Sequence, residues 1–353
     1  TARCFLELIR REEFTQSQLK VDGGYFARFR ESNPETIQPI AITHVNLKKA
    51  SGKLQKSSTP GLSKEEIREN LDELSEAPFA HLHNHSQFSI LQSTASVADL
   101  VNAAAANDMP AVAMTDHANM MGAFEFIRAV NSYNATLAAG ENEQDKKPLK
   151  AIIGCEFQVC EDMLDRTRKD NGYQTVILAK NKEGYHNLAK MASLAYTQGF
   201  YYVPRIDKKT VETYKEGLIV LTGNMYGEVP SKILNEGESQ AEDAFLWWKE
   251  QFGGDFYVEL MRHGQEDEDR ANEFLIQLAR KHDVQMVASN NTYYIHKEDA
   301  NAHDILLCVK DNEKQATPIG RGRGYRYGLP NQEYYFKSGQ EMKQLFKDLP
   351  EAI

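Results

Sequence analysis

The sequence His81-Leu82-His83-Asn84-His85 places three of the ten histidines of the chain on alternate residues. Alternate side chains of a β-strand share a face, so this spacing predicts three imidazoles aimed in one direction. Imidazole is the commonest protein ligand for zinc-, iron- and manganese-type ions. The pattern therefore indicates a metal site. The alternative is a half-buried strand whose histidines only hydrogen-bond their neighbours.

Two further motifs carry candidate ligands. Asp116-His117 follows the apolar run 110–114, and Glu156 follows the apolar run 149–153. Both runs are typical of buried strands. The carboxyl ends of parallel strands meet at one edge of a barrel or sheet, where sites are built. We therefore expect His83, His85, His117 and Glu156 to converge.

The elements that must position these residues alternate along the chain, which predicts an α/β fold with right-handed crossovers. Candidate ligands at several strand ends favour a closed or nearly closed barrel of seven strands. Helical periodicity is expected near 96–107, 121–133, 183–196, 239–252, 267–282 and 297–309. Strands are expected near 79–83, 110–115, 149–159, 173–179, 217–222, 255–261 and 284–289.

The first part of the chain differs from the rest. Residues 1–50 predict a small α+β or irregular segment of unassigned function. Residues 51–77 predict a linker followed by a charged helix at 64–75, which Ser63 and Glu66 would open with a capping box. The barrel domain is expected to occupy residues 78–353.

Composition limits the function. The composition, 41% hydrophobic and 26% charged, is typical of an ordinary globular protein. The length of 353 residues predicts roughly two domains. No apolar run reaches the ~18 residues of a membrane span, and no signal peptide is visible. The four cysteines form no CxxC pair, which favours a reducing compartment, so we expect a cytoplasmic protein. The chain starts without Met and is expected to be a fragment.

The segment 79–126 (FAHLHNHSQFSILQ…MPAVAMTDHANMMGAFEF) resembles the opening of the PHP (polymerase and histidinol phosphatase) domain of bacterial replicative DNA polymerase III alpha subunits. The similarity continues through IIGCEF, GYHNLAKMASLAYTQGFYYVPRID, EGLIVLTG, MVASNNTYYI and EMKQLFKDLPEAI. Another possibility is a free-standing phosphatase of small phosphate esters, but such a protein would lack the GYHNL to PRID and LPEAI segments. The resemblance implies a distorted seven-stranded (β/α)7 PHP barrel.

The resemblance also implies a ligand set. Metal-binding members carry nine ligands for three ions at the barrel mouth and hydrolyse phosphoesters, including 3′-terminal nucleotides. This chain keeps His83, His85, His117 and Glu156, the last as the bridging carboxylate. The other five ligand positions hold uncharged side chains, which are poor ligands for zinc-type ions: Gln92, Gln174, Asn224, Asn291 and Tyr293.

The altered positions predict a PHP site that has lost trinuclear phosphoester hydrolysis. At most one divalent metal, zinc, manganese or iron, would remain at His83, His85 and Glu156. The domain would then be mainly structural, docking a proofreading exonuclease subunit and other replisome components. The remainder of the polymerase chain would bind template–primer DNA and use magnesium as a nucleotidyltransferase; the polymerase carboxylates are absent here. The alternative is an active metal-dependent 3′–5′ exonuclease or phosphoesterase.

Two other features stay open. His263 follows another predicted strand and would line the same mouth, or it is a structural histidine. Arg321, Arg323 and Arg326 lie in a glycine- and tyrosine-rich segment that would contact DNA, or form a solvated loop. The whole net charge of −10 lies in residues 78–353, so any nucleic-acid contact must be local or shared with another part of the protein.

Overall fold

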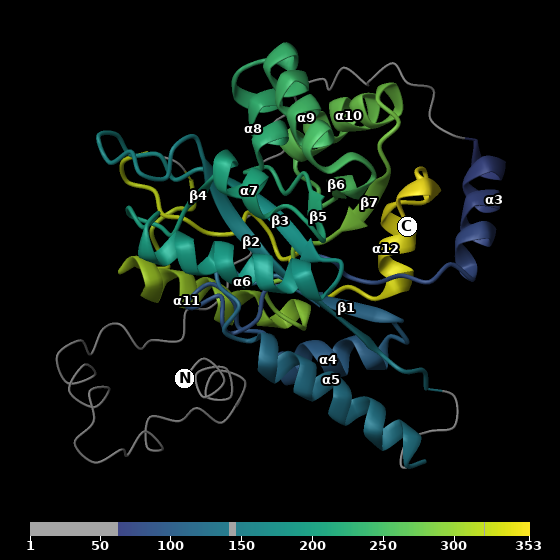
Figure 1. The fold of residues 1–353 in the computed structure, drawn as a ribbon. Coiled ribbons are helices and arrows are strands. Elements are labelled where there is room, and N and C mark those ends of the chain that lie inside the picture. The colour runs from purple at the N-terminus through teal and green to yellow at the C-terminus, as the bar shows by residue number, and fades with distance from the viewer. Residues whose placement is uncertain (1–62, 141–145, 321) are drawn as a thin grey trace, which may run out of the picture. The chain divides into compact units, whose positions relative to one another are not determined.

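The computed structural model describes residues 63–140, 146–320 and 322–353, of which Lys64–Ile353 form one compact unit (Figure 1). The predicted segment 1–50, the linker up to residue 62 and Arg321 lie outside the described residues. No helix of the described residues is long and apolar enough to cross a membrane.

One mixed sheet carries the candidate site. Among the described residues it has seven strands, in the order β1-β2-β3-β5-β6-β7 with β4 beside β2. Most neighbouring pairs are parallel, but β3 runs antiparallel to both β2 and β5. The strands are β1 (Ala111–Met114), β2 (Lys150–Cys160), β3 (Tyr173–Ala179), β4 (Ile206–Asp207), β5 (Leu218–Leu221), β6 (Phe256–Met261) and β7 (Met286–Ser289).

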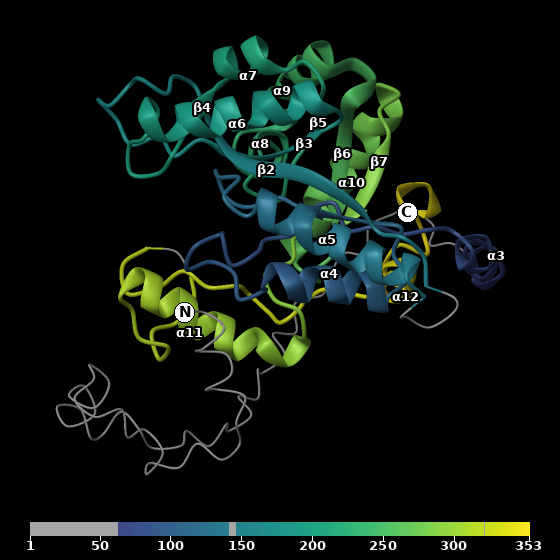
Figure 2. The same cartoon turned by 60° about the horizontal axis from the view of Figure 1, so that its bottom comes forward.

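Ten helices of the described residues surround this sheet. Figure 2 shows α4 and α5 side by side and α8 against α9. Helix α3 packs beside α12, where the Asn70 amide donates to the Lys347 carbonyl at 2.9 Å. The helices are α3 (Lys64–Ser75), α4 (Val97–Ala106), α5 (Ala123–Ala138), α6 (Lys182–Thr197), α7 (Lys208–Tyr214), α8 (Glu228–Asn235), α9 (Glu238–Phe252), α10 (Glu266–Lys281), α11 (Ala300–Asp311) and α12 (Gly339–Leu345).

The predicted alternation is confirmed with specific differences. Seven helices and six strands lie where they were expected, whereas α7, α8, α12 and β4 were not predicted. The antiparallel placement of β3 follows from the chain between β2 and β3, which contains no helix. A parallel partner needs a longer crossover, usually through a helix.

The histidine segment closes the ring instead of forming a regular strand, so the predicted strand at 79–83 is wrong. Its only assigned pairing in the described chain is the parallel bridge from Asn84 to Thr292, just after β7. On its other side, the Ala113 amide of β1 donates to the His81 carbonyl at 2.9 Å. The segment therefore lies between β7 and β1 and joins the two ends of the curled sheet.

Two apolar layers hold the ring. Inside it, Ala113, Val176 and Leu221 form a small buried cluster from three different strands. Outside it, a larger core packs the other strand faces against the helices. Because side chains alternate along a strand, Glu156 lies on the inner face of β2 with Ile152, which packs on the inner cluster. The inner apolar cluster thus forms the floor beneath the candidate ligands.

Candidate metal centre

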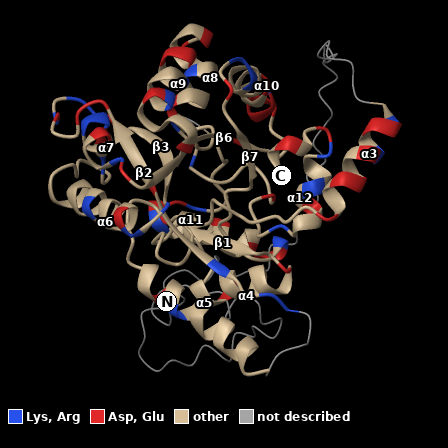
Figure 3. Cartoon of the chain, turned by 45° about the vertical axis from the view of Figure 1, so that its right-hand side comes forward, with Lys and Arg blue, Asp and Glu red and all other residues tan. Residues whose placement is uncertain are grey.

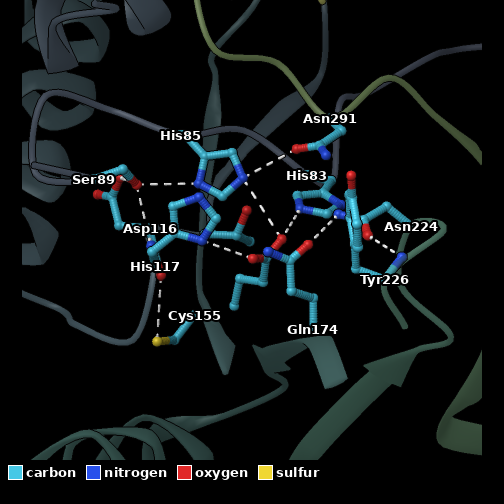
Figure 4. A network of polar contacts seen from close by, with 12 residues as sticks. His83, His85, Ser89, Asp116, His117, Cys155, Gln174, Asn224, Tyr226 and Asn291 are labelled. Atoms are coloured by element: carbon cyan, nitrogen blue, oxygen red, sulfur yellow. Dashed lines mark hydrogen bonds and ion pairs between the residues drawn. The ribbon is translucent and has the colours of Figure 1, made fainter. Parts of the chain in front are cut away.

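Three of the predicted ligands converge at one end of the ring (Figure 4). One ligand atom each of His83, His85 and Glu156 lies within 4.8 Å of the others. All three side chains are fully buried or nearly so. His81 is not part of the group: its Nε2 bonds the Lys337 carbonyl at 2.7 Å. The three imidazoles therefore do not share one direction, because the segment that carries them is not a regular strand.

His83 lies between two buried carboxylates. Its Nε2 is 2.8 Å from Oε2 of Glu156, and its Nδ1 is 2.9 Å from Oε1 of Glu259. Burial lowers the pKa of His83, but Glu259 and Glu156 outweigh burial and raise it to about 10. Without an ion, the imidazolium therefore supplies the positive charge between the two carboxylates.

Glu156 accepts contacts from all three remaining candidate histidines. His117 Nδ1 lies 2.7 Å from Oε1 of Glu156, and His85 Nε2 lies 3.7 Å from Oε2. The Oε1 atom is nevertheless without a well-aligned hydrogen bond. Burial raises the pKa of Glu156, but His117, His83 and His85 together hold it well below its ordinary value. The predicted convergence of all four residues is found in the structure.

His85 is held in the opposite way, by neutral groups. Its Nδ1 lies 3.1 Å from the Ser89 hydroxyl, and its Nε2 lies 3.0 Å from Oδ1 of Asn291. Its ring stacks between those of His117 and Tyr293, with centroids 4.1 and 4.4 Å away. Burial and the neighbouring His117 lower the pKa of His85 well below its ordinary value. A neutral imidazole can offer one lone pair to a metal ion.

Comparison with known proteins supplies a family for this ring. A family model described as the PHP domain matches residues 81–263. The chain belongs to the PHP family. It is 38% identical over 279 residues to DNA polymerase III subunit alpha of Borreliella burgdorferi, which covers 78% of this chain and 23% of that protein. The corresponding protein of Thermus aquaticus is 38% identical over 285 residues, covering 79% of this chain and 22% of the relative.

The chain therefore spans less than a quarter of the length of these relatives. Among solved structures, an amidohydrolase from Chromobacterium violaceum aligns with 61% of this chain and 87% of its own length. Its TM-score is 0.38 and its identity 13%, a similarity too distant to inform the chemistry of the site.

Four of the five residues predicted at altered ligand positions bond to one another or to the candidate histidines. The Asn224 amide donates to Oε1 of Gln174 at 2.8 Å (Figure 4), and Oδ1 of Asn224 accepts from the Tyr226 amide at 2.8 Å. Asn291 adopts a φ of 44°, a left-handed conformation that Asn tolerates better than most residues. It is this turn after β7 that brings its side chain to His85.

The other two altered positions differ from these amides. Tyr293 stacks on His85, and its hydroxyl lies 3.4 Å from Nε2 of His117. Burial raises the pKa of Tyr293 well above its ordinary value, which keeps its phenol neutral. Gln92 contributes a backbone carbonyl that bonds Nε2 of His303 at 2.8 Å. Among the described residues, the Gln92 side chain makes no hydrogen bond to the histidine group.

His263 lines the same pocket as Gln174, Asn224, Asn291 and Tyr293. Its ring nitrogens are both engaged, with Oε1 of Glu268 at 2.7 Å and the carbonyl of Asn290 at 2.9 Å. It also stacks on Tyr334, with centroids 4.0 Å apart. The structure therefore places His263 at the mouth but in a self-contained structural pair.

The arginines of the glycine-rich segment are in different environments. Arg326 is buried, and its guanidinium forms a bidentate ion pair with Asp304 at 2.7 and 2.8 Å. That pairing leaves it no free face for a phosphate. Arg323 is exposed. In the view of Figure 3, Lys and Arg are interspersed with Asp and Glu across the described chain.

The residues present fit one divalent ion. Two imidazoles, which bind ions in their neutral form, and a carboxylate make a donor set that zinc and similar ions accept. Within the described residues, Oε2 of Glu259 is a buried oxygen without a hydrogen-bond partner, and Oε1 of Glu156 has only the contact with His117. Glu259, which the motif analysis did not single out, is the additional carboxylate of this centre. The sequence signal for it is a lone acidic residue inside the apolar run 256–261.

Proposed function

We propose that this PHP domain is mainly a structural and partner-docking part of a replicative DNA-directed DNA polymerase, with a site that no longer performs trinuclear phosphoester hydrolysis. Its similarity to DNA polymerase III alpha subunits supports the placement in a polymerase. The observation that carries the loss of hydrolysis is the hydrogen bond between Asn224 and Gln174. Two positions that would hold metal instead satisfy each other.

Trinuclear hydrolysis needs several cations around one phosphate. Clustered ions polarise the phosphate, lower the pKa of a bound water and stabilise the leaving oxygen. Here His83, His85 and Glu156 would hold one ion, which could supply charge for one of these tasks. The neutral amides at the other positions can donate and accept hydrogen bonds but cannot concentrate cations.

The proposed partners follow from the polymerase assignment. The remainder of the polymerase chain would pack on this domain and bind template–primer DNA with its own magnesium ions. A separate proofreading exonuclease subunit and other replisome components would dock on its surface, in the cytoplasm. The interspersed charges of Figure 3 support a protein-docking role better than direct binding of DNA.

A second candidate is an active metal-dependent 3′–5′ exonuclease or phosphoesterase. The observation that favours it is the preserved group of His83, His85 and Glu156 beside His117. With a single ion, this function would require a water activated by that ion together with His117. The two candidates predict different metal stoichiometries.

Elemental analysis of the full 353-residue chain, combined with hydrolysis of a 3′-labelled single-stranded oligonucleotide, separates them. We expect zero or one equivalent of metal and no hydrolysis above that of the His83→Ala variant. Two or three equivalents, with turnover that His83→Ala abolishes, would overturn the structural proposal. The exposed His186→Ala variant serves as the control for handling and metal contamination.

A further inference from the structure

A second layer of polar side chains lies behind the two imidazoles of the residual metal position. Behind His83 is Glu259 of β6, which is 1% exposed and contacts Nδ1. Glu156 contacts the opposite nitrogen, Nε2. Because a carboxylate only accepts, the proton on the Glu259 side is held at Nδ1. In the metal-free chain Nε2 also carries a proton, which faces Glu156, and this is the proton that an ion would displace.

Behind His85 lies a hydroxyl whose roles can be counted. Ser89 Oγ donates to Oδ1 of Asp116 at 2.6 Å and accepts from the His117 amide at 3.1 Å. Its single proton is therefore used, and its contact with Nδ1 of His85 must be a second acceptance. His85 accordingly carries its proton on Nδ1, and its Nε2 is the unprotonated nitrogen.

The Asp116 carboxylate is fixed in turn. It accepts from the Ser86 amide at 2.7 Å and from the Ser86 hydroxyl at 2.7 Å. Together with the Ser89 hydroxyl, they make three donors that hold the Asp116 carboxylate in one orientation. The structure places Oδ1 of Asn291 3.0 Å from Nε2 of His85. With Nε2 unprotonated, the amide would instead present its N–H there, since the oxygen and nitrogen of an amide exchange places by rotation.

We infer that Glu259 and the Ser89–Asp116 pair are positioning residues that keep Nδ1 of His83 and of His85 protonated, so that Nε2, which faces Glu156, is the nitrogen of each ring that would bind an ion. The two Nε2 atoms lie 2.8 and 3.7 Å from the same oxygen of Glu156. The inference rests on the proposed function only in taking this group as the one residual metal position. It assigns to Glu259, Ser89 and Asp116 a role in metal affinity without direct contact with the ion.

Carboxylates that hold a metal-bound histidine through its other nitrogen typically change metal affinity by about 10- to 100-fold when they are mutated. The test is competition for Zn²⁺ between the full chain and a chromophoric chelator. We expect Glu259→Ala to weaken Zn²⁺ binding by about 100-fold. Glu259→Gln, whose amide oxygen still accepts from Nδ1, should restore most of the geometry and weaken binding by only about tenfold.

The chain provides a matched control in the His263–Glu268 pair. Glu268 is likewise buried and bonds an Nδ1 atom at 2.7 Å in the same pocket, but outside the ligand group. Glu268→Gln should leave Zn²⁺ affinity within about twofold of the unmodified chain. Equal effects of Glu259→Gln and Glu268→Gln would overturn the positioning role, because a general loss of stability would then explain both.

The protonated nitrogen is also directly measurable by ¹⁵N NMR of histidine in the metal-free chain. We expect His85 as the Nδ1–H tautomer and a mixture of tautomers in Ser89→Ala, with no change in Ser193→Ala, which alters an exposed serine of α6. A dominant Nε2–H tautomer in the unmodified chain would overturn the inference. Absence of any Zn²⁺ binding would overturn it too while leaving the structural proposal standing, whereas observed hydrolysis would overturn only the latter.

Discussion

The barrel mouth has a histidine half and an amide half, and the two satisfy their buried polar side chains in different ways. In the histidine half, His83 and His117 place ring nitrogens on the buried Glu156. In the amide half, Gln174 and Asn224 bond each other, and neither side chain carries a charge. The first half is stable only with a proton or a cation between its carboxylates, whereas the second is satisfied alone. The amide half thus needs no ion to satisfy its buried polar groups.

The largest effect is expected from removing the charge between the two carboxylates. His83→Ala leaves Glu156 and Glu259 buried without their shared partner, and breaking such a buried pair costs about 3–5 kcal/mol. Urea unfolding in the presence of a chelator measures this loss. The exposed His186→Ala is the control, and a loss below about 1 kcal/mol would contradict the described charge balance.

Raising the pH should lower the free energy of unfolding by less than His83→Ala does, because the imidazole stays in place, and this loss should come from the histidine half alone. The folded pKa of His83 is raised from 6.5 to about 10, so its contribution is complete below pH 6.5 and is lost as pH rises through 10. The lowered pKa of Glu156 contributes above pH 4.5 and is lost in acid. The metal-free chain should therefore unfold at lower urea concentration at pH 10 than at pH 7.

The control for this pH dependence is His83→Gln, which should flatten the alkaline limb. A limb of the same depth in that variant would assign the alkaline loss to other groups, such as the tyrosines of the mouth. Saturating Zn²⁺ should also flatten it, since an ion replaces the proton between the carboxylates.

Rebuilding one ligand should sharpen the comparison. Asn291→Asp puts a carboxylate beside Nε2 of His85, where the amide now lies at 3.0 Å. We expect Zn²⁺ to bind about tenfold more tightly, or ~1.4 kcal/mol, because carboxylate is the better ligand. Chelator competition measures the gain. Asn290→Asp, one residue away with its amide bonded to backbone carbonyls, is the matched control.

The smallest effect is expected in the amide half. Asn224→Ala removes one neutral hydrogen bond to Gln174 and one from the Tyr226 amide, a loss of about 1–2 kcal/mol that pH and metal should not alter. Urea unfolding at pH 7 and pH 10 gives the comparison. A pH-dependent loss in this variant would mean that the two halves are electrostatically coupled.

Local pattern was sufficient to predict which segments meet at the candidate site. His83, His85, His117 and Glu156 each follow or interrupt an apolar run, and the structure brings all four together. The irregular backbone of the ring-closing segment was not predictable. The alternation of residue types in 79–83 is the same whether or not the segment pairs with neighbouring strands over its whole length. Helices α7 and α8 were missed because they are only seven and eight residues long, too short for a periodic signal.

Glu259 was missed for a different reason. Its partner His83 is 176 residues away, so no local spacing connects them. A single acidic residue within the buried run 256–261 is nevertheless a usable signal, because a lone buried carboxylate requires a partner. The arginine segment shows that a local cluster can also mislead. Arg326 belongs to a basic cluster in sequence, but its guanidinium is paired with Asp304 on α11.

The closure of the ring by the histidine segment has a kinetic consequence. His85 and Asn291 are 206 positions apart, and the bridge from Asn84 to Thr292 spans a similar stretch of chain. Contacts of such long range carry a large loop-closure entropy and tend to form late in folding. The histidine group is therefore expected to assemble in one of the last folding steps, after the helices and the antiparallel pair β2–β3 have formed. The same seam offers a route for partial opening, in which the backbone amides of His85 and Thr292 exchange with solvent before those of the inner strands.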